Sequence, residues 1–230
     1  MKYADFEQII SAPRLGRYVR ACGNNTKKAM TLYRLNLSLS QELYTVVSCF
    51  EIALRNAVDA HYTAQLGNDW LRDAVAPGGM FDVPQCYNTA KVIKWALSKF
   101  ARLHIPYTHH KLVAEMDFGL WRYLFAQPHF YAWHQTLLRV FTAKPSSTPL
   151  IQYNHTFLFN ELAHVNDVRN RIAHHEPICF QVGSAAISSA YVRQQYALIR
   201  TLFQWMNVDE AGLLYGLDHI EKVCDKLDRL

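Results

Sequence analysis

Residues 41–62 read QELYTVVSCFEIALRNAVDAHY, and the spacing of their apolar side chains decides the fold class. At 100° per residue, one narrow arc of a helix collects Leu43, Val47, Phe50, Leu54 and His61. Ser40 stands where an N-cap should precede this stretch, and Gly67 can close it. The pattern predicts a long amphipathic helix over residues 40–66 with one buried stripe.

The same three- and four-residue spacing recurs along almost the whole chain, whereas alternating, strand-like runs are scarce. Helices are predicted at 14–22, 25–36, 40–66, 88–104, 110–126, 128–143, 155–175, 185–206 and 209–229. Pro128 suits the first turn of one of them. Residues 67–87 and 144–149 are predicted as surface loops, and neither resembles a domain linker. A single all-α domain over residues 1–230 is therefore expected.

Composition places few limits on function. The net charge of +5 suits an anionic partner such as RNA, but many proteins share such an excess. The five cysteines are scattered without the spacing of a zinc site, so free thiols in a reducing cytoplasm are expected. The first residues do not resemble a signal peptide, and no apolar run approaches the roughly 20 residues of a membrane span. We expect a cytoplasmic protein without a membrane segment.

Residues 168–177, VRNRIAHHEP, collect two arginines, an asparagine and two adjacent histidines at the end of a predicted helix. Arg169 falls in the middle of the apolar stripe that Leu158, Leu162, Val165 and Ile172 define. A guanidinium without a partner in a dry core would cost several kcal/mol, roughly 3–5. Arg169 is therefore predicted to meet a carboxylate, with Glu51 as a candidate, or to face a functional cleft.

Helix geometry limits how these side chains can meet. Asn170 and His174 are four residues apart, so the amide can orient the imidazole, but Arg169 and His174 point about 140° apart. The mismatch is smaller if the helix loosens before Pro177, which disfavours helical backbone at Glu176. It is smaller again if two copies of the motif face each other across a two-fold axis, which hints at a dimer.

Histidine, arginine and asparagine together fit one reaction of RNA. Histidine can act as general base or acid, typically worth about 10²–10⁴ in rate, and arginine stabilises the charge that grows on a phosphate. These groups suit cleavage in which a 2′-hydroxyl attacks the adjacent phosphorus, a reaction that needs no metal. No carboxylate cluster of the kind that binds magnesium is evident in the sequence.

The residues 169–174, RNRIAH, match the R-x4-H signature of HEPN ribonucleases, and RNRIAHHEPI resembles the abortive-infection (Abi-like) branch of that superfamily. Residues 14–62 are similar to the N-terminal half of that branch, and 113–125, VAEMDFGLWRYLF, are similar to its central helix. The resemblance covers most of residues 9–178, whereas 179–230 match less clearly.

The resemblance implies a helical bundle of the HEPN type with extra helices, and a metal-independent endoribonuclease without a cofactor. Such proteins commonly act as homodimers whose paired motifs form one cleft. Members are associated with phage defence and with toxin–antitoxin systems. The implied partners are an RNA substrate, a second copy of the chain, and an RNA or protein antitoxin.

By the same resemblance, Arg169 and His174 take the catalytic positions and Asn170 supports them. Arg171 belongs to the same motif, and His175 is expected to replace or assist His174. The stretch from Glu51 to Arg55 and Asn56 matches a second motif of the branch and is expected to line the same cleft. An ordinary surface pair of Glu51 and Arg55, worth roughly 0.3–0.5 kcal/mol, is the alternative.

A second class of function stays open, namely a catalytically silent helical module that binds RNA or a protein partner and keeps the motif as a structural network. Other features are ambiguous too. The aromatic residues of 118–133 suit a core better than base stacking. Seven cations could form either a phosphate-tracking surface or a solvated helix face: Lys27, Lys28, Arg34, Lys91, Lys94, Lys99 and Arg102.

Overall fold

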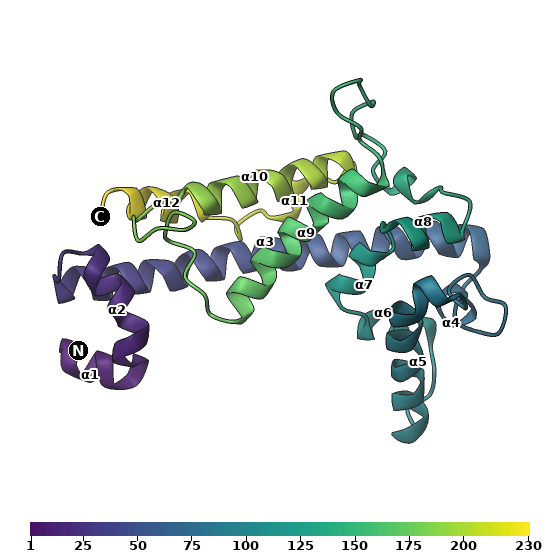
Figure 1. Ribbon diagram of the computed structural model, residues 1–230, viewed down its shortest axis with the longest axis horizontal. Coiled ribbons are helices and arrows are strands. Elements are labelled where there is room, and N and C mark those ends of the chain that lie inside the picture. Colours follow the sequence, from purple (N-terminus) through teal and green to yellow (C-terminus); the bar gives the residue numbers. More distant parts are fainter. The chain divides into compact units, whose positions relative to one another are not determined.

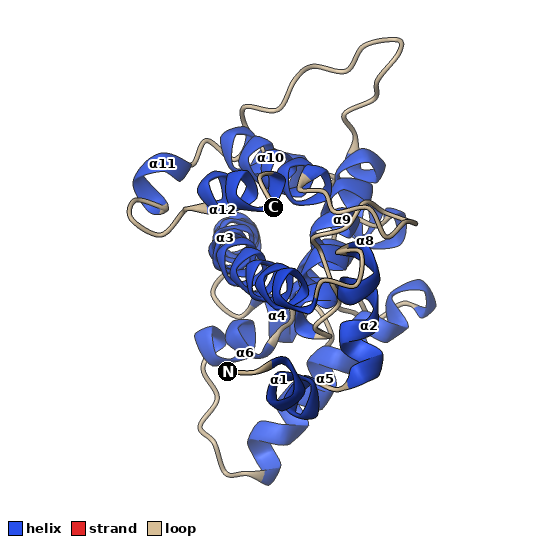
Figure 2. Cartoon of the chain, turned by 90° about the vertical axis from the view of Figure 1, so that its left-hand side faces the viewer, coloured by secondary structure: helices blue, strands red, loops and turns tan.

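Helices account for all the regular structure of the chain. The computed structural model describes residues 1–230 and contains twelve α-helices and two short 3₁₀ helices (Figure 1). No strand is present, and the one β-bridge pairs Phe180 with Ile187 (Figure 2). No helix combines the length and the apolar composition that a membrane crossing needs. The predicted all-α class is confirmed.

The chain divides into two compact units, which are described separately. The first unit comprises residues 1–49, 167–201 and 209–230, and the second comprises 50–166 and 202–208. Helices α3 (Thr26–Leu66) and α9 (His155–Ala173) contribute residues to both units.

The first unit is assembled on the first half of α3. Its other elements are α1 (Tyr3–Ile10), α2 (Ala12–Ala21), most of α10 (Ala190–Trp205), α11 (Glu210–Leu213) and α12 (Ile220–Asp228). The rings of Phe6 and Tyr18 contact Tyr33 of α3, with centroids 5.5 and 5.1 Å away. On α10, Arg193 pairs with Asp225 and Asp228 of α12, which runs beside it (Figure 1).

The second unit is assembled on the second half of α3. Its short elements are α4 (Trp70–Asp73), η1 (Pro84–Cys86), α5 (Tyr87–Arg102), α6 (His109–Glu115), α7 (Phe118–Tyr123), α8 (Gln127–Ala132) and η2 (Leu137–Val140). Phe50 lies at its core, and its ring contacts Phe118 and Phe203. Thr108 and Asp117 cap α6 and α7 through their side-chain oxygens, as N-cap residues commonly do.

Several predicted boundaries were wrong. The helices predicted at 25–36 and 40–66 are one helix, α3, and Ser40 lies inside it and not at an N-cap. Leu32, Leu39 and Leu43 are fully buried, so the apolar stripe continues across the predicted break. The turn after Gly67 and the place of Pro128 in the first turn of α8 were predicted correctly.

Short helices account for the remaining differences. The segment 110–126 is divided at Asp117, 128–143 becomes α8 and η2, and the C-terminal segment becomes α11 and α12. The predicted loop 67–87 holds α4 and η1, and α1 was missed. Side-chain caps at Asp117 and Asp209 start α7 and α11 inside segments that periodicity alone would continue as one helix.

Candidate functional site

The motif at 168–177 lies where α9 ends. The last helical residue is Ala173, and the chain then turns in a Schellman motif. The His175 N–H donates to the Ile172 carbonyl at 2.9 Å, and the Glu176 N–H donates to the Arg171 carbonyl at 2.8 Å. His175 has φ of 57°, the left-handed conformation that glycine usually supplies at this position. The predicted loosening before Pro177 is therefore present, as a left-handed turn.

The turn sends the two adjacent histidines to different surroundings. His174 still donates its backbone N–H to the Asn170 carbonyl at 2.8 Å, so it stays on the last turn of α9. His175 leaves the helix and lines a cavity. Both side chains are exposed. One motif thus offers a helical histidine next to Asn170 and a second histidine that faces a cavity.

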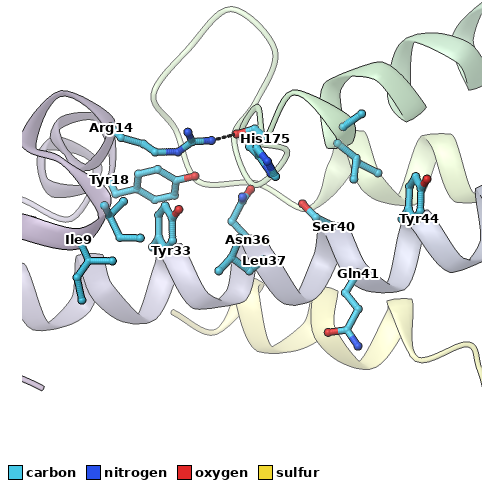
Figure 3. A pocket seen from close by; sticks show the side chains of 13 residues that line it. Ile9, Arg14, Tyr18, Tyr33, Asn36, Leu37, Ser40, Gln41, Tyr44 and His175 are labelled. Atoms are coloured by element: carbon cyan, nitrogen blue, oxygen red, sulfur yellow. Dashed lines mark hydrogen bonds between the residues drawn. The ribbon is translucent and has the colours of Figure 1, made fainter. Parts of the chain in front are cut away.

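The cavity has a volume of about 590 Å³ and is formed within the first unit (Figure 3). Residues of α1, α2, α3 and the end of α9 line it. Its polar lining includes Arg14, Tyr18, Tyr33, Asn36, Ser40 and His175. A guanidinium, two phenols, an amide, a hydroxyl and an imidazole therefore border one space next to the end of α9.

Two arginines of α2 hold the segment that follows α9. Arg14 donates from Nη2 to the His175 carbonyl at 2.5 Å, the bond drawn in Figure 3. Arg17 donates to the Ser184 carbonyl at 2.5 Å and stacks over the Phe180 ring at 4.2 Å. A guanidinium has five N–H donors, so Arg14 keeps donors for an anion at the cavity. Neither arginine was predicted as a site residue.

Asn36 of α3 fixes the same segment from inside. Its side chain is buried, and Oδ1 accepts from the backbone N–H groups of Ile178 at 2.8 Å and Cys179 at 3.2 Å. Asn36 falls on the stripe of α3 that also carries Leu32, Leu39 and Leu43. A polar residue on an apolar stripe was the signal that could have revealed it, as it revealed Arg169.

The arginines of the motif differ in their surroundings. Arg171 donates to the Pro177 carbonyl at 2.8 Å, pairs with Glu176 at 3.3 Å and stacks over the Tyr191 ring at 4.4 Å. It therefore holds the turn in place. Arg169 is half-buried, and its Nε is buried without a hydrogen-bond partner. An unmade hydrogen bond of a buried donor is costly, so a partner that accepts from Nε would stabilise the site.

The second predicted motif belongs to the second unit. There, Glu51 and Arg55 are half-buried on α3, and Arg55 Nε donates to Asn56 Oδ1 at 3.3 Å. Asn56 is exposed and borders another cavity, of about 510 Å³, together with Asp59 and His109. The structure thus gathers Arg169, Asn170, Arg171, His174 and His175 at the end of α9, while a shared cleft with the second motif stays a prediction.

Two histidines outside the motif, His109 and His129, make polar contacts inside the second unit. His109 lies 2.7 Å from the Asp59 carboxylate, which also accepts from Trp70 Nε1 at 2.7 Å. His129 contacts the Thr89 hydroxyl at 2.7 Å, and burial lowers the pKa of its imidazole to about 4. No three side chains of His, Cys, Asp or Glu gather in a way that could hold a metal ion.

Comparisons of the chain with protein-family models, with curated proteins and with solved structures find no match. The function proposed below therefore rests on the residues of the site, their geometry and the resemblance of the sequence motifs.

Proposed function

We propose that this chain is a metal-independent endoribonuclease of the HEPN type. One observation carries the proposal. At the end of α9, the motif carries Arg169, whose Nε is a buried donor without a partner, and two exposed histidines, of which His175 lines a cavity that Arg14 also borders. Imidazole and guanidinium groups are what transesterification of RNA requires, and Arg169 and His174 occupy the positions of the R-x4-H signature.

The reaction needs one proton acceptor and one proton donor. A base removes the proton of the ribose 2′-hydroxyl, whose oxygen attacks the adjacent phosphorus. The bond between phosphorus and the 5′-oxygen then breaks, and that oxygen takes up a proton. The products are a 2′,3′-cyclic phosphate and a 5′-hydroxyl. Histidine suits both proton transfers near neutral pH.

Within this proposal, the roles follow from position. His174 acts as the base, because Asn170 lies one helical turn before it and can orient its imidazole. His175 faces the cavity. It has one of two roles: it contacts the bound strand, or it donates the proton that the leaving 5′-oxygen takes up. Arg169 and Arg14 stabilise the charge on the phosphate as the 2′-oxygen attacks. Arg171 positions the turn and does not touch the substrate.

The wider biological role comes from the resemblance alone. The proposed role is in abortive infection, or as the toxin of a toxin–antitoxin pair that an RNA or protein antitoxin inhibits. Either role would be carried out in the cytoplasm. A homodimer belongs to the same proposal, because Arg169 and His174 of one copy diverge by about 140° on an ideal helix. A second copy would bring the missing partner to each group.

The test is cleavage of a pool of labelled RNAs by purified protein in excess EDTA. Wild type is compared with Arg169→Ala, His174→Ala and His175→Ala, and with His134→Ala as an exposed histidine outside the motif. We expect wild type to cleave RNA and to leave 2′,3′-cyclic ends. Cleavage should be lost in Arg169→Ala and His174→Ala and should persist in His134→Ala. Equal cleavage by all the variants would show that a contaminant or another site is responsible.

One observation favours a second candidate, a silent binding module. Arg14 and Arg171 both donate to backbone carbonyls, so part of the polar network has a structural role. In a silent module, His174→Ala would alter stability or RNA affinity, with no cleavage to lose. In the enzyme, the same change abolishes cleavage and leaves folding and RNA affinity nearly intact.

A further inference from the structure

Helix α5 of the second unit presents one face that combines aromatic and basic side chains. Successive members of this face are separated by one to four residues, so they follow one side of the helix. We call it the α5 aromatic–basic face, and it comprises Tyr87, Lys91, Lys94, Trp95, Ser98 and Arg102. The opposite side of α5 is apolar and buried, through Ile93, Ala96 and Phe100.

The two aromatic residues of this face are exposed. Trp95 is 60% exposed and Tyr87 is 63% exposed, whereas Trp70 and Trp121 are buried. A tryptophan normally contributes its large apolar surface to a core or an interface. A shallow hollow of about 340 Å³ lies on the face, bordered by both rings and by Lys91 and Lys94.

The charges of the face are positive and accessible. Lys91 and Arg102 are exposed and form no ion pair. Lys94 lies 3.7 Å from Asp82, and both side chains of that pair are largely exposed. Lys99 pairs with Glu115 at 2.7 Å, and its Nζ also lies 5.9 Å from the centroid of the Trp95 ring. Lysines therefore flank the exposed indole on two sides.

We propose that the α5 aromatic–basic face binds single-stranded RNA. Surfaces that track a single strand combine cations for the phosphates with aromatic rings on which bases stack. Tyr87 and Trp95 are about 12 Å apart along the helix axis, several times the rise between stacked bases, so they would hold two bases that are splayed apart. A duplex would hide those bases, and a protein partner would leave the lysines desolvated.

The identity of the strand as RNA rests on the proposed function, whereas the stacking surface itself does not. Residue spacing alone left the lysines of α5 open to two interpretations, a phosphate-tracking surface or a solvated face. The two exposed rings on the same face favour the first, because apolar surface that is grouped on one exposed face marks an interaction site.

The test is binding of a fluorescently labelled single-stranded RNA with 2′-O-methyl riboses, followed by anisotropy. Such a strand lacks the 2′-hydroxyl that the proposed cleavage needs, so it stays intact during the measurement. Tyr87→Ala and Trp95→Ala should each weaken binding about 10-fold, within the range measured for loss of one stacking contact. The double variant Lys91→Gln/Lys94→Gln should make the dependence of log K on log salt shallower by about 1.4, the effect of two phosphate contacts on a single strand. The matched control, Lys222→Gln/Lys226→Gln, removes two exposed lysines of α12 and should bind as wild type does.

Three outcomes separate the two proposals. Equal affinity of wild type and the α5 variants, or no RNA binding by wild type, overturns the α5 surface. Loss of affinity in the α5 variants with no cleavage by any protein supports the surface and defeats the ribonuclease. If Trp95→Ala cleaves RNA at the wild-type rate and binds it with the wild-type affinity, the proposed ribonuclease activity is retained and α5 has no part in it. Quenching of tryptophan emission by RNA, absent in Trp95→Ala, would show the contact directly, since Trp95 is the exposed tryptophan.

Discussion

His175 combines an unusual backbone with a side chain that faces the cavity. A non-glycine residue at φ of 57° is strained by about 1 kcal/mol relative to glycine. We predict that His175→Gly raises the free energy of unfolding by up to about 1 kcal/mol relative to His175→Ala, measured by urea denaturation. Both variants lack the imidazole, so equal losses of RNA cleavage in the two would assign the loss to the side chain. A glycine variant less stable than the alanine variant would show that the turn is not strained.

His129 gives stability a dependence on pH that is unrelated to the site. Burial lowers the pKa of its imidazole to about 4 in the folded chain, from about 6.5 in the unfolded chain. Between these two values only the unfolded state takes up the proton. The contribution of the buried, neutral His129 imidazole to stability is therefore complete above about pH 6.5, and it declines as the pH falls toward 4.

We therefore predict that lowering the pH from about 7.5 to about 5 removes roughly 2 kcal/mol of stability through His129. The half-buried His61, whose pKa burial also lowers, acts in the same direction. Urea midpoints at both pH values should differ less for His129→Gln than for wild type, because glutamine does not titrate. The exposed control His134→Gln should keep the wild-type dependence; if His129→Gln keeps it too, the imidazole of His129 is not the cause.

At the scale of elements, the contact between α3 and the segment after α9 depends on Asn36. Its side chain accepts from two buried backbone N–H groups, at Ile178 and Cys179. We predict that Asn36→Ala destabilises the fold by roughly 2–4 kcal/mol, because each orphaned donor costs about 1–3 kcal/mol. Asn56→Ala, at an exposed position of the same helix, should change stability by less than about 0.5 kcal/mol. Similar stability of the two variants would mean that water replaces the amide at Ile178.

The elements also show what the sequence could and could not reveal. Periodicity located the stripe of α3 and the polar residue Arg169 on α9, because both are local properties of a helix. It misplaced the start of the long helix at Ser40, since a serine followed by a glutamine and a glutamate resembles a cap whether or not the stripe continues before it. Asp117 was not recognised as the N-cap of α7, although its bond from the Leu120 N–H is local, because apolar residues continue at helical spacing on both sides of it.

At the scale of the whole molecule, the candidate site combines distant parts of the sequence. The residues of the R-x4-H motif could be predicted, since they are contiguous and resemble a known signature. Arg14 could not, and for Asn36 the sequence offered only its polar place on an apolar stripe. Both reach the same turn from far along the chain, 161 and 142 residues away. Pattern analysis of one sequence contains no information on such long-range pairings. For α5 the case differs: its charged and aromatic residues are evident in the sequence, but their role could not be interpreted until their exposure was known.

A second copy of the chain is the largest-scale feature of the proposed function, and mixed dimers test it. If the two copies share one catalytic cleft that needs Arg169 and His174 from both of them, one inactive copy disables that cleft. We predict that dimers of one wild-type and one His174→Ala copy, isolated with two different affinity tags, cleave RNA at well below half the wild-type rate per dimer. Dimers of wild type with His134→Ala, in which a histidine outside the motif is changed, should cleave as wild type does. Half activity would instead indicate two catalytic pairs that act independently of each other. A protein that sediments as a monomer while cleaving RNA at full rate would exclude a composite cleft, because every catalytic group would then come from one chain.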